Sequence, residues 1–267
     1  MVSRSDYMIN SQGVSLSASL LSPDGKGPHP GLIICHGMPS TPRSSQLDIG
    51  GHANVSDQGI TYLQLAEIFA WDGFATVIFN FRGTGHSTGN FHYSGWVEDL
   101  KSVISWASNI STVDKGQIVL LGSSLGAAIA IYVSAVRDDV AGLISFASPA
   151  VFGRRSDPEE DIKRLRDQGL IRDPDFPEST EEWASEGVEI SPMDWVGRIH
   201  SKPILLLHGD SDETVSVSNV HSLFEAASDL KEINILPGVG HRFRSEHLAV
   251  EAARDWLGRN FPSKNSF

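Results

Sequence analysis

Short, continuous apolar runs recur along the chain and predict the strands of a largely buried sheet. They lack the alternation of polar and apolar residues that a half-exposed strand shows, so they are typical of strands covered on both faces. The runs occupy residues 31–35, 75–79, 118–121, 141–146 and 203–207. A shorter, more polar run over 233–236 is expected to be the last strand. The alternating stretch 14–22 predicts a half-exposed edge strand instead.

Helical patterns fill the intervals between these runs. They cover residues 62–71, 96–107, 125–136, 217–227 and 246–261. Alternation of strand and helix predicts an α/β fold with a mostly parallel central sheet and helices on both faces. In such sheets, binding and catalytic residues gather at the carboxyl ends of the strands.

The rhythm is interrupted between Pro149 and Lys202, where dense charge replaces any strand signal. A segment of this length inside a compact domain is usually functional or disordered. Apolar residues spaced through it predict a helical cap, or lid, inserted at 149–202 into a core formed by 1–148 and 203–267. The alternative is a solvated, partly mobile insertion.

Composition narrows the classes of function. The chain has 267 residues, of which 40% are hydrophobic and 20% charged, and its formal net charge is -12. These values fit a globular protein and argue against a partner with a phosphate backbone, because nucleic-acid binding relies on a basic surface. No apolar run is long enough to span a bilayer. The start of the chain lacks the apolar core of a secretory signal and Cys35 is the only cysteine, so we expect a cytoplasmic protein without disulfides.

The most informative local pattern is Gly-x-Ser-x-Gly at 122–126, placed directly between a predicted strand and a predicted helix. In such an elbow the serine is exposed at the top of the sheet, which makes Ser124 the candidate nucleophile. The next amide, on Leu125, lies at a helix N-terminus and could donate to an oxyanion. An ordinary Gly/Ser turn is the alternative. Cys35, which is followed by His36, is a second candidate nucleophile, although buried cysteines are often simply small apolar residues.

A serine nucleophile needs a base and an acid, and both are expected after later strands, in the order Ser, acid, His. His241 is the candidate base because it lies in a glycine-containing loop between the last predicted strand and the last helix. Asp210 and Asp212 both follow the strand that ends at residue 207, and position alone leaves the choice open. His208 is expected to make a structural hydrogen bond.

Taken together, these motifs resemble the α/β-hydrolase superfamily and, within it, small esterases similar to cinnamoyl and feruloyl esterases. The resemblance covers about residues 15–261. Its marks are His36-Gly37, the stretch 80–87, the elbow 122–126, the stretch 208–215 and Gly240-His241.

The resemblance also implies roles that spacing does not. The family pattern His-Gly-x-x-Asp-x-x-Val falls on 208–215 and implies that Asp212 is the acid. It implies that the amide of Met38 is the second oxyanion donor and that 81–87 is a structural turn in which Arg82 ties loops together. The segment 39–59 is longer than a minimal hydrolase needs, and its Gly50-Gly51-His52 is expected to shape the acyl-side entrance.

These residues predict two-step acyl transfer by Ser124, His241 and Asp212. The expected substrate is a small-molecule carboxylic ester with a short or aromatic, feruloyl-like acyl group, contacted by Trp183 and Trp195 of the cap. No metal or cofactor motif is present in the sequence, and no nucleic-acid or membrane partner is expected for this monomer or homodimer. A serine aminopeptidase or amidase, or a thioesterase, is the alternative. A catalytically silent binding protein of the same fold is a third hypothesis.

Overall fold

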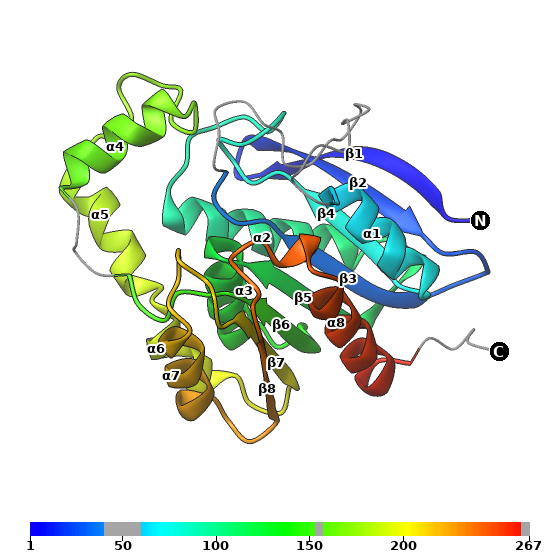
Figure 1. Ribbon diagram of the computed structural model, residues 1–267. Helices are drawn as coiled ribbons and strands as arrows, with labels where there is room; N and C mark the ends of the chain where they lie inside the picture. Colours follow the sequence, from blue (N-terminus) through cyan, green and yellow to red (C-terminus); the bar gives the residue numbers. More distant parts are fainter. Residues whose placement is uncertain (40–59, 153–156, 263–267) are drawn as a thin grey trace.

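An eight-stranded sheet forms the centre of the computed structural model, which describes residues 1–39, 60–152 and 157–262. Its strand order is β1-β2-β4-β3-β5-β6-β7-β8 (Figure 1). The strands are β1 (Ser3–Ser11), β2 (Val14–Ser22), β3 (His29–Cys35), β4 (Ala75–Phe79), β5 (Val113–Ser123), β6 (Gly142–Phe146), β7 (Ile204–Gly209) and β8 (Lys231–Leu236). From β4 to β8 all neighbouring strands pair in parallel, as the apolar runs predict.

The amino-terminal end of the sheet differs from the prediction. β2 pairs with β1 on one side and with β4 on the other, both antiparallel, and most of its residues are buried. The expectation that 14–22 is a half-exposed edge strand was therefore wrong. The edge is β1, which the sequence pattern did not reveal because six of its nine residues are exposed. Gln12 and Gly13, with φ of 51° and 85°, form the tight turn that joins the two strands.

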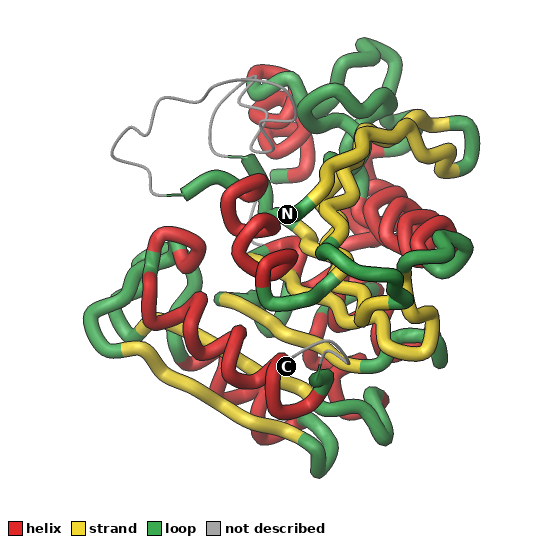
Figure 2. Tube along the Cα trace, turned by 90° about the vertical axis from the view of Figure 1, so that its right-hand side faces the viewer, coloured by secondary structure: helices red, strands yellow, loops and turns green. Residues whose placement is uncertain are grey.

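Helices cover both faces of the sheet. Alternate residues of each buried strand enter opposite cores, as Ile33 and Ile34 of β3 do. One core includes α2, α3 and α7, and the other includes α1 and α8, so helices flank the strands in Figure 2. The helices are α1 (Tyr62–Trp71), α2 (Tyr93–Ala107), α3 (Leu125–Val136), α7 (Ser218–Ala226) and α8 (His247–Asn260).

The interval between β6 and β7 is helical in its described part. It contains α4 (Pro158–Asp167), α5 (Thr180–Glu189), α6 (Pro192–Trp195) and the 3-10 helix η1 (Val196–Arg198). Asp157 and Ser179 cap the first two helices by accepting hydrogen bonds from first-turn amides. In Figure 1, α4 and α5 lie to one side of the sheet, at its upper left. The division into a core and a cap at 149–202 stays a prediction.

None of the helices that the structure describes combines the length and the apolar character needed to cross a lipid bilayer.

A buried ion pair links the loop after β4 to α2. Both the Nε and Nη2 atoms of Arg82 donate to Asp99 Oδ1, at 3.0 and 2.8 Å, and the Arg82 amide donates to Oδ2 at 2.8 Å. Asp99 is fully buried. Arg82 Nη1 also lies 3.0 Å from Nε2 of His92, the residue that precedes α2. The expectation that Arg82 ties loops together is confirmed by these contacts.

Replacing Asp99 by alanine leaves the Arg82 guanidinium buried without its counter-charge. We expect Asp99→Ala to lower the free energy of unfolding by about 3–5 kcal/mol, as breaking a buried ion pair does. Urea unfolding followed by circular dichroism measures this change. The matched control is Glu98→Ala, which removes a half-exposed ion pair with Lys101 and a hydrogen bond from Gln12 and should change the free energy of unfolding by less than about 1 kcal/mol. Equal losses in the two variants would contradict the assignment.

Candidate active site

Ser124 occupies the sharp turn between β5 and α3. Its φ of 53° and ψ of -122° lie in a region that costs a residue with a side chain about 1–3 kcal/mol. The backbone is held there because the Ser124 amide donates to Phe146 O at 2.9 Å and the Ala127 amide donates to Ser124 O at 3.0 Å. The side chain makes no capping hydrogen bond, so the hydroxyl remains available for chemistry.

Glycines allow three backbone segments to meet at this turn. A Cβ on Gly122 would lie 2.4 Å from Ala127 Cα, and a Cβ on Gly126 would lie 2.3 Å from His36 O. A Cβ on Gly37 would lie 3.0 Å from Ser124 Cβ. The loop after β3 therefore packs directly against the elbow, which is possible only without side chains at these positions.

This close approach also positions the two expected oxyanion donors. Met38 is half-buried and directly follows Gly37, the residue that packs against Ser124. Leu125 is the first residue of α3, so its N–H has no acceptor within the helix. Both amides belong to segments that leave the carboxyl ends of neighbouring strands, β3 and β5. Their role in binding an oxyanion stays a prediction.

Asp212 lies in the loop after β7 and accepts hydrogen bonds on both oxygens. The amides of Thr214 and Val215 each donate to Oδ1 at 2.8 Å, and His241 Nδ1 donates to Oδ2 at 2.8 Å. The side chain is fully buried. Burial alone would raise the pKa of Asp212, but the hydrogen bonds from Val215, His241 and Thr214 outweigh it and hold the pKa below its usual value. The carboxyl is therefore ionised at neutral pH.

The structure distinguishes the two acids that position alone left open. Asp210 is exposed, and its Oδ1 accepts hydrogen bonds from the Gly238 amide at 2.7 Å and the Ser211 hydroxyl at 3.0 Å. These contacts close the turn after β8. Asp212 is the acid that contacts His241.

His241 lies in the loop between β8 and the 3-10 helix η2 (Phe243–Ser245). Its side chain is 24% exposed, so the ring is reachable from solvent. Because Nδ1 donates to the Asp212 carboxylate, the neutral ring carries its proton there and Nε2 is left as an acceptor. Within the described part of the chain, Nε2 has no hydrogen-bond partner of its own. This is the arrangement that a general base requires.

Phe146, at the end of β6, joins the serine and histidine segments. Its carbonyl holds the Ser124 amide, and its ring stacks on Phe243 with centroids 3.7 Å apart and planes within 8°. Phe243 is two residues beyond His241. Sequence reasoning missed this link because the two phenylalanines are far apart in the chain and each reads as an ordinary core residue.

The other candidates near the elbow are structural. Cys35 is fully buried, and burial raises the pKa of its thiol, so the thiolate needed of a nucleophile is disfavoured. Burial lowers the pKa of His36 to about 4, and this neutral ring bonds Gly37 O through Nδ1. His208 makes the expected structural hydrogen bond, with Nε2 at 2.8 Å from Val215 O. The entrance expected at Gly50-Gly51-His52 lies outside the described residues, as does the rest of 40–59.

The two tryptophans expected to contact substrate have different surroundings. Trp183 of α5 is buried, and its Nε1 donates to Phe91 O at 3.3 Å. Trp195 of α6 packs edge-on against Tyr132 of α3, at 4.5 Å between centroids, and its Nε1 donates to Glu189 O at 2.8 Å.

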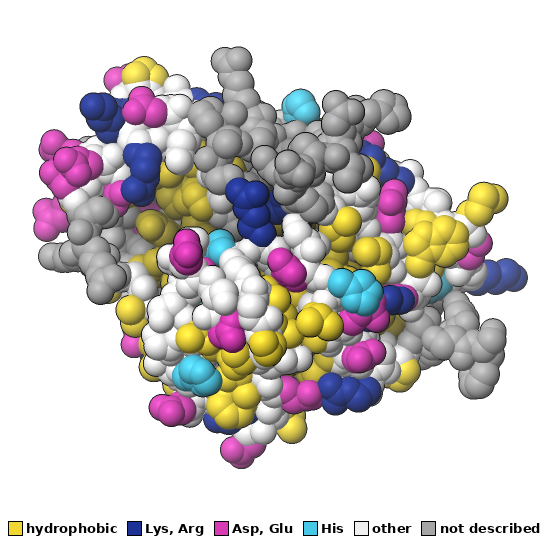
Figure 3. All heavy atoms as spheres, in the orientation of Figure 1, with side chains coloured by type: hydrophobic (Ala, Val, Ile, Leu, Met, Phe, Trp, Pro, Cys, Tyr) yellow, Lys and Arg dark blue, Asp and Glu magenta, His cyan; other side chains and the backbone are white. Residues whose placement is uncertain are grey.

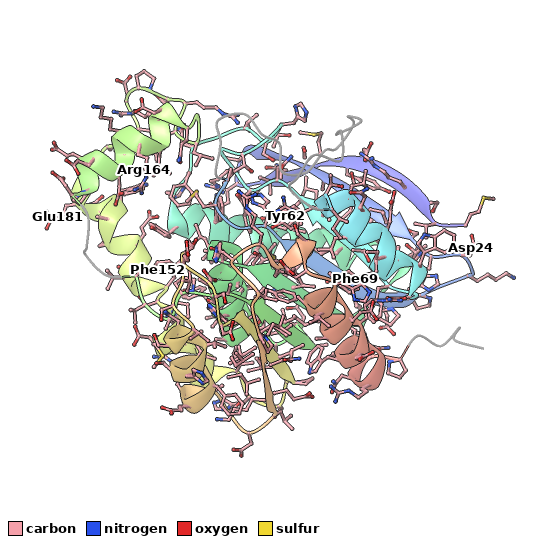
Figure 4. The ribbon with its side chains drawn as sticks, viewed as in Figure 1. Asp24, Tyr62, Phe69, Phe152, Arg164 and Glu181 are labelled. Carbon is pink, nitrogen blue, oxygen red and sulfur yellow. The ribbon has the colours of Figure 1, made fainter. Side chains whose placement is uncertain are left out.

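Trp183 also lines a cavity of about 550 Å³ between α4, α5, the start of α2 and the segment after β6. Tyr93 and Phe152 supply further aromatic rings to its wall, with centroids 5.4 Å apart. Figure 3 shows apolar side chains at the bottom of a hollow in this part of the surface, and Figure 4 labels Phe152 and Glu181, which both line the cavity. Trp195 is not among its described lining residues.

Comparisons with known proteins agree with this fold. The family model described as X-Pro dipeptidyl-peptidase (S15 family) matches residues 12–181. An uncharacterized protein of Mycobacterium tuberculosis is 27% identical over 239 residues, which cover 88% of this chain and 72% of that protein.

Solved structures give the same result. The α/β hydrolase GrgF from Penicillium sp. sh18 aligns with a TM-score of 0.74 at 19% identity, over 97% of this chain and 99% of that chain. Est1E from Butyrivibrio proteoclasticus, with ferulic acid bound, aligns with a TM-score of 0.70 at 21% identity, over 95% and 98% of the two chains. The expected α/β-hydrolase fold is confirmed.

The lowered pKa of Asp212 predicts a pH-dependent contribution to stability. A carboxyl whose folded pKa lies below its unfolded value of 3.8 stabilises the fold above that value and loses the contribution as pH falls through the folded pKa. We expect Asp212→Asn to lower the free energy of unfolding by about 1–3 kcal/mol at pH 7, because hydrogen bonds to a charged group are lost. The difference from wild type should shrink below about pH 4.

Urea unfolding between pH 3 and pH 8 measures this dependence. Ser124→Ala is the control, since it leaves the carboxyl in place and should follow the wild-type pH profile. If the loss in free energy of unfolding caused by Asp212→Asn stays constant down to pH 3, the carboxyl of Asp212 does not have a lowered pKa in the folded protein.

Proposed function

We propose that this chain, which belongs to the X-Pro dipeptidyl-peptidase (S15) family of the α/β-hydrolase superfamily, is a serine hydrolase that cleaves carboxylic esters. The observation that carries the proposal is the 2.8 Å contact between His241 and the buried Asp212, at the sheet edge where Ser124 occupies its strained turn. Nucleophile, base and acid each follow the carboxyl end of a parallel strand, namely β5, β8 and β7.

In the proposed mechanism, His241 Nε2 takes the proton of the Ser124 hydroxyl as the oxygen attacks the ester carbonyl. Asp212 keeps the other ring proton on Nδ1 and stabilises the imidazolium that forms. The amides of Leu125 and Met38 donate to the oxyanion of the tetrahedral intermediate. His241 then protonates the leaving alcohol, and an acyl-enzyme on Ser124 remains. In the second step His241 takes a proton from water, whose oxygen attacks the acyl carbonyl. His241 then returns the proton to the Ser124 oxygen, and the carboxylic acid is released.

The proposed substrates carry short or aromatic acyl groups of the feruloyl type. Two observations support this choice: the aromatic cavity lined by Tyr93, Phe152 and Trp183, and the likeness in fold to Est1E, whose structure contains ferulic acid. Of the two cap tryptophans, we propose Trp183 as the acyl contact, because it lines this cavity whereas Trp195 is not among the described lining residues and packs on Tyr132.

Hydrolysis of an amide or peptide bond is the second candidate, and the description of the matching family favours it. The same nucleophile, base and oxyanion donors would serve an ester, an amide or a thioester, since the fold does not select among them. A catalytically silent binding protein is the third. The intact set of Ser124, His241 and Asp212 argues against it, because a binding role does not need a buried acid aligned on a solvent-accessible histidine.

The remaining proposals concern the protein's surroundings. We propose a cytoplasmic monomer or homodimer that needs no metal or cofactor and binds neither nucleic acid nor membranes. The formal net charge of -12 and the single, buried cysteine support this. The described residues contain no group of three or more His, Cys, Asp or Glu that could hold a metal ion.

The first test is hydrolysis of p-nitrophenyl esters from acetate to decanoate, with methyl ferulate and aminoacyl and Xaa-Pro anilides alongside. Ser124→Ala should lower ester kcat by at least about 1,000-fold, because no nucleophile remains. The matched control is Ser123→Ala, which removes the neighbouring hydroxyl and should stay within about tenfold of wild type.

Each result separates the candidates. Activity restricted to an anilide would replace the esterase proposal by the peptidase. Folded protein without activity on any substrate would support the binding protein, and ester turnover that survives in Ser124→Ala would exclude the proposed nucleophile.

The tryptophans can be tested as a pair. Trp183→Leu should lower kcat/KM for methyl ferulate relative to p-nitrophenyl acetate by about 10-fold or more, because an aryl contact is lost. Trp195→Leu should leave this ratio unchanged. An altered ratio in both variants would restore Trp195 as a substrate contact, whereas an unaltered ratio in both would exclude the cavity as the acyl site.

A further inference from the structure

The hydroxyl of Tyr93 is a polar group in the wall of the aromatic cavity. Tyr93 is the first residue of α2 and lines this cavity of about 550 Å³ together with Phe152 and Trp183. Its ring centroid lies 5.4 Å from that of Phe152 and 6.0 Å from that of Trp183. Among the residues that the structure describes, none forms a hydrogen bond with the Tyr93 hydroxyl. This group is therefore available to bond a ligand in the cavity.

Packing fixes the position of the Tyr93 ring. A Cβ on Gly187 of α5 would lie 3.1 Å from Tyr93 Cε2 and 3.2 Å from Cζ, the carbon that bears the hydroxyl, so α5 approaches the ring closely because Gly187 has no side chain. Phe91 lies edge-on to the ring, with centroids 5.2 Å apart. Glu186 of α5 accepts a hydrogen bond from the Ser94 amide at 3.0 Å, which joins α5 to the first turn of α2. The hydroxyl is thus carried on a ring that two helices hold in place.

The Tyr93 hydroxyl is a hydrogen-bond donor at neutral pH. Burial and, to a smaller extent, the Asp161 carboxylate raise the pKa of Tyr93 to about 12, so the proton is retained. The charged residues in the described lining of the cavity are all acidic, namely Asp157, Glu159, Asp161 and Glu181. A ligand group that accepts from Tyr93 in these surroundings is expected to be uncharged, because a carboxylate would be repelled.

The chain connects this cavity to the proposed nucleophile. Phe152 lies six residues after Phe146, the last residue of β6, whose carbonyl accepts the hydrogen bond from the Ser124 amide. The Phe152 amide donates to Ser191 Oγ at 3.1 Å, which joins the segment after β6 to the start of α6. One wall of the cavity therefore begins at the strand end that holds Ser124.

We propose that Tyr93 is a specificity-determining residue that donates its hydroxyl hydrogen to an uncharged oxygen substituent on the aromatic ring of the acyl group. This inference deepens the proposed function and rests on it. The aromatic walls favour any aryl group, whereas the hydroxyl favours only rings that carry an acceptor. An unsubstituted ring would shut the donor away from water without a partner, which is unfavourable. The preferred substrates are then esters of oxygen-substituted aryl acids, ahead of unsubstituted aryl and short aliphatic ones.

The experiment removes the two partners of this hydrogen bond separately. Tyr93→Phe keeps the ring and removes the hydroxyl. Methyl 3,4-dimethoxycinnamate carries ring oxygens that only accept hydrogen bonds, and methyl cinnamate lacks them. Methoxy groups also change the size and reactivity of the ester, so the decisive quantity is the change between proteins in the ratio of kcat/KM for the two esters. We expect Tyr93→Phe to lower this ratio by about 3- to 10-fold, as the loss of one hydrogen bond does.

Tyr132→Phe is the matched control. Tyr132 is a half-buried tyrosine of α3 that is not among the described lining residues of the cavity, so this variant should keep the wild-type ratio. An equal change of the ratio in Tyr93→Phe and Tyr132→Phe, or no change in Tyr93→Phe, overturns the proposal.

A binding measurement separates this inference from the proposed function, because it needs no turnover. Ligand-observed NMR gives the dissociation constants of the two methyl esters for Ser124→Ala and for Ser124→Ala combined with Tyr93→Phe. A preference for the dimethoxy ester that falls by about 3- to 10-fold without the hydroxyl supports the role of Tyr93 even if the wild type hydrolyses neither ester. An unchanged preference, or binding of neither ester, overturns it even if the protein is an active esterase.

A second measurement covers the case in which Tyr93→Phe does not fold. Ser124→Ala is labelled with ¹³C at tyrosine Cζ, and the Tyr93 signal is followed as each methyl ester is added. A signal that moves with the dimethoxy ester and less with methyl cinnamate supports the proposal. A signal that stays unchanged, or that moves at least as far with methyl cinnamate, overturns it.

Discussion

The closeness with which three backbone segments meet at Ser124 is the constraint on which the rest of the site depends. Gly122 and Gly126 let β5 turn into α3 beneath the loop that follows β3, and Gly37 lets that loop touch the serine. The strain stored at Ser124 is sustained because the amide and carbonyl of this residue are both bonded, one to β6 and one to α3. The same contacts bring the Met38 and Leu125 amides to adjacent strand ends, so the proposed nucleophile and the proposed oxyanion donors depend on the same three glycines.

The carboxylate of Asp212, in the loop after β7, is held by charge-assisted hydrogen bonds. A buried carboxylate is costly unless donors surround it, and here two amides of its own turn and the His241 imidazole from the loop after β8 do so. The turn after β7 is thus held by hydrogen bonds to an anion, whereas the elbow after β5 is held by close backbone contacts that glycines allow. The two turns are held by different interactions, yet each places one residue of the proposed mechanism at the end of a parallel strand.

The sequence predicted the parts of the fold that are set by local burial. Continuous apolar runs identified β3 to β7, a shorter and more polar run identified β8, and α1 and α3 have the predicted bounds. The pattern did not predict β1, because most of its residues are exposed and its pairing with β2 leaves little trace in the hydrophobic pattern. Spacing could not choose between Asp210 and Asp212, because two residues in one loop can point either way; only the three-dimensional turn sends one to Gly238 and the other to His241. The Phe146–Phe243 stack depends on a contact between distant segments, which no local pattern encodes.

The stack of Phe146 on Phe243 links the position of Ser124 to the position of the His241 loop. Phe146 holds Ser124 through its carbonyl and contacts the His241 loop through its ring, so the end of β6 supports both residues, which are more than a hundred positions apart. A small shift of β6 carries Ser124 and the His241 loop in the same direction and preserves their separation, whereas a lateral displacement of α8, which follows Phe243, moves the His241 loop alone. Movements of the carboxyl-terminal helix should therefore change the separation of Ser124 and His241 more than movements of β6 of equal size.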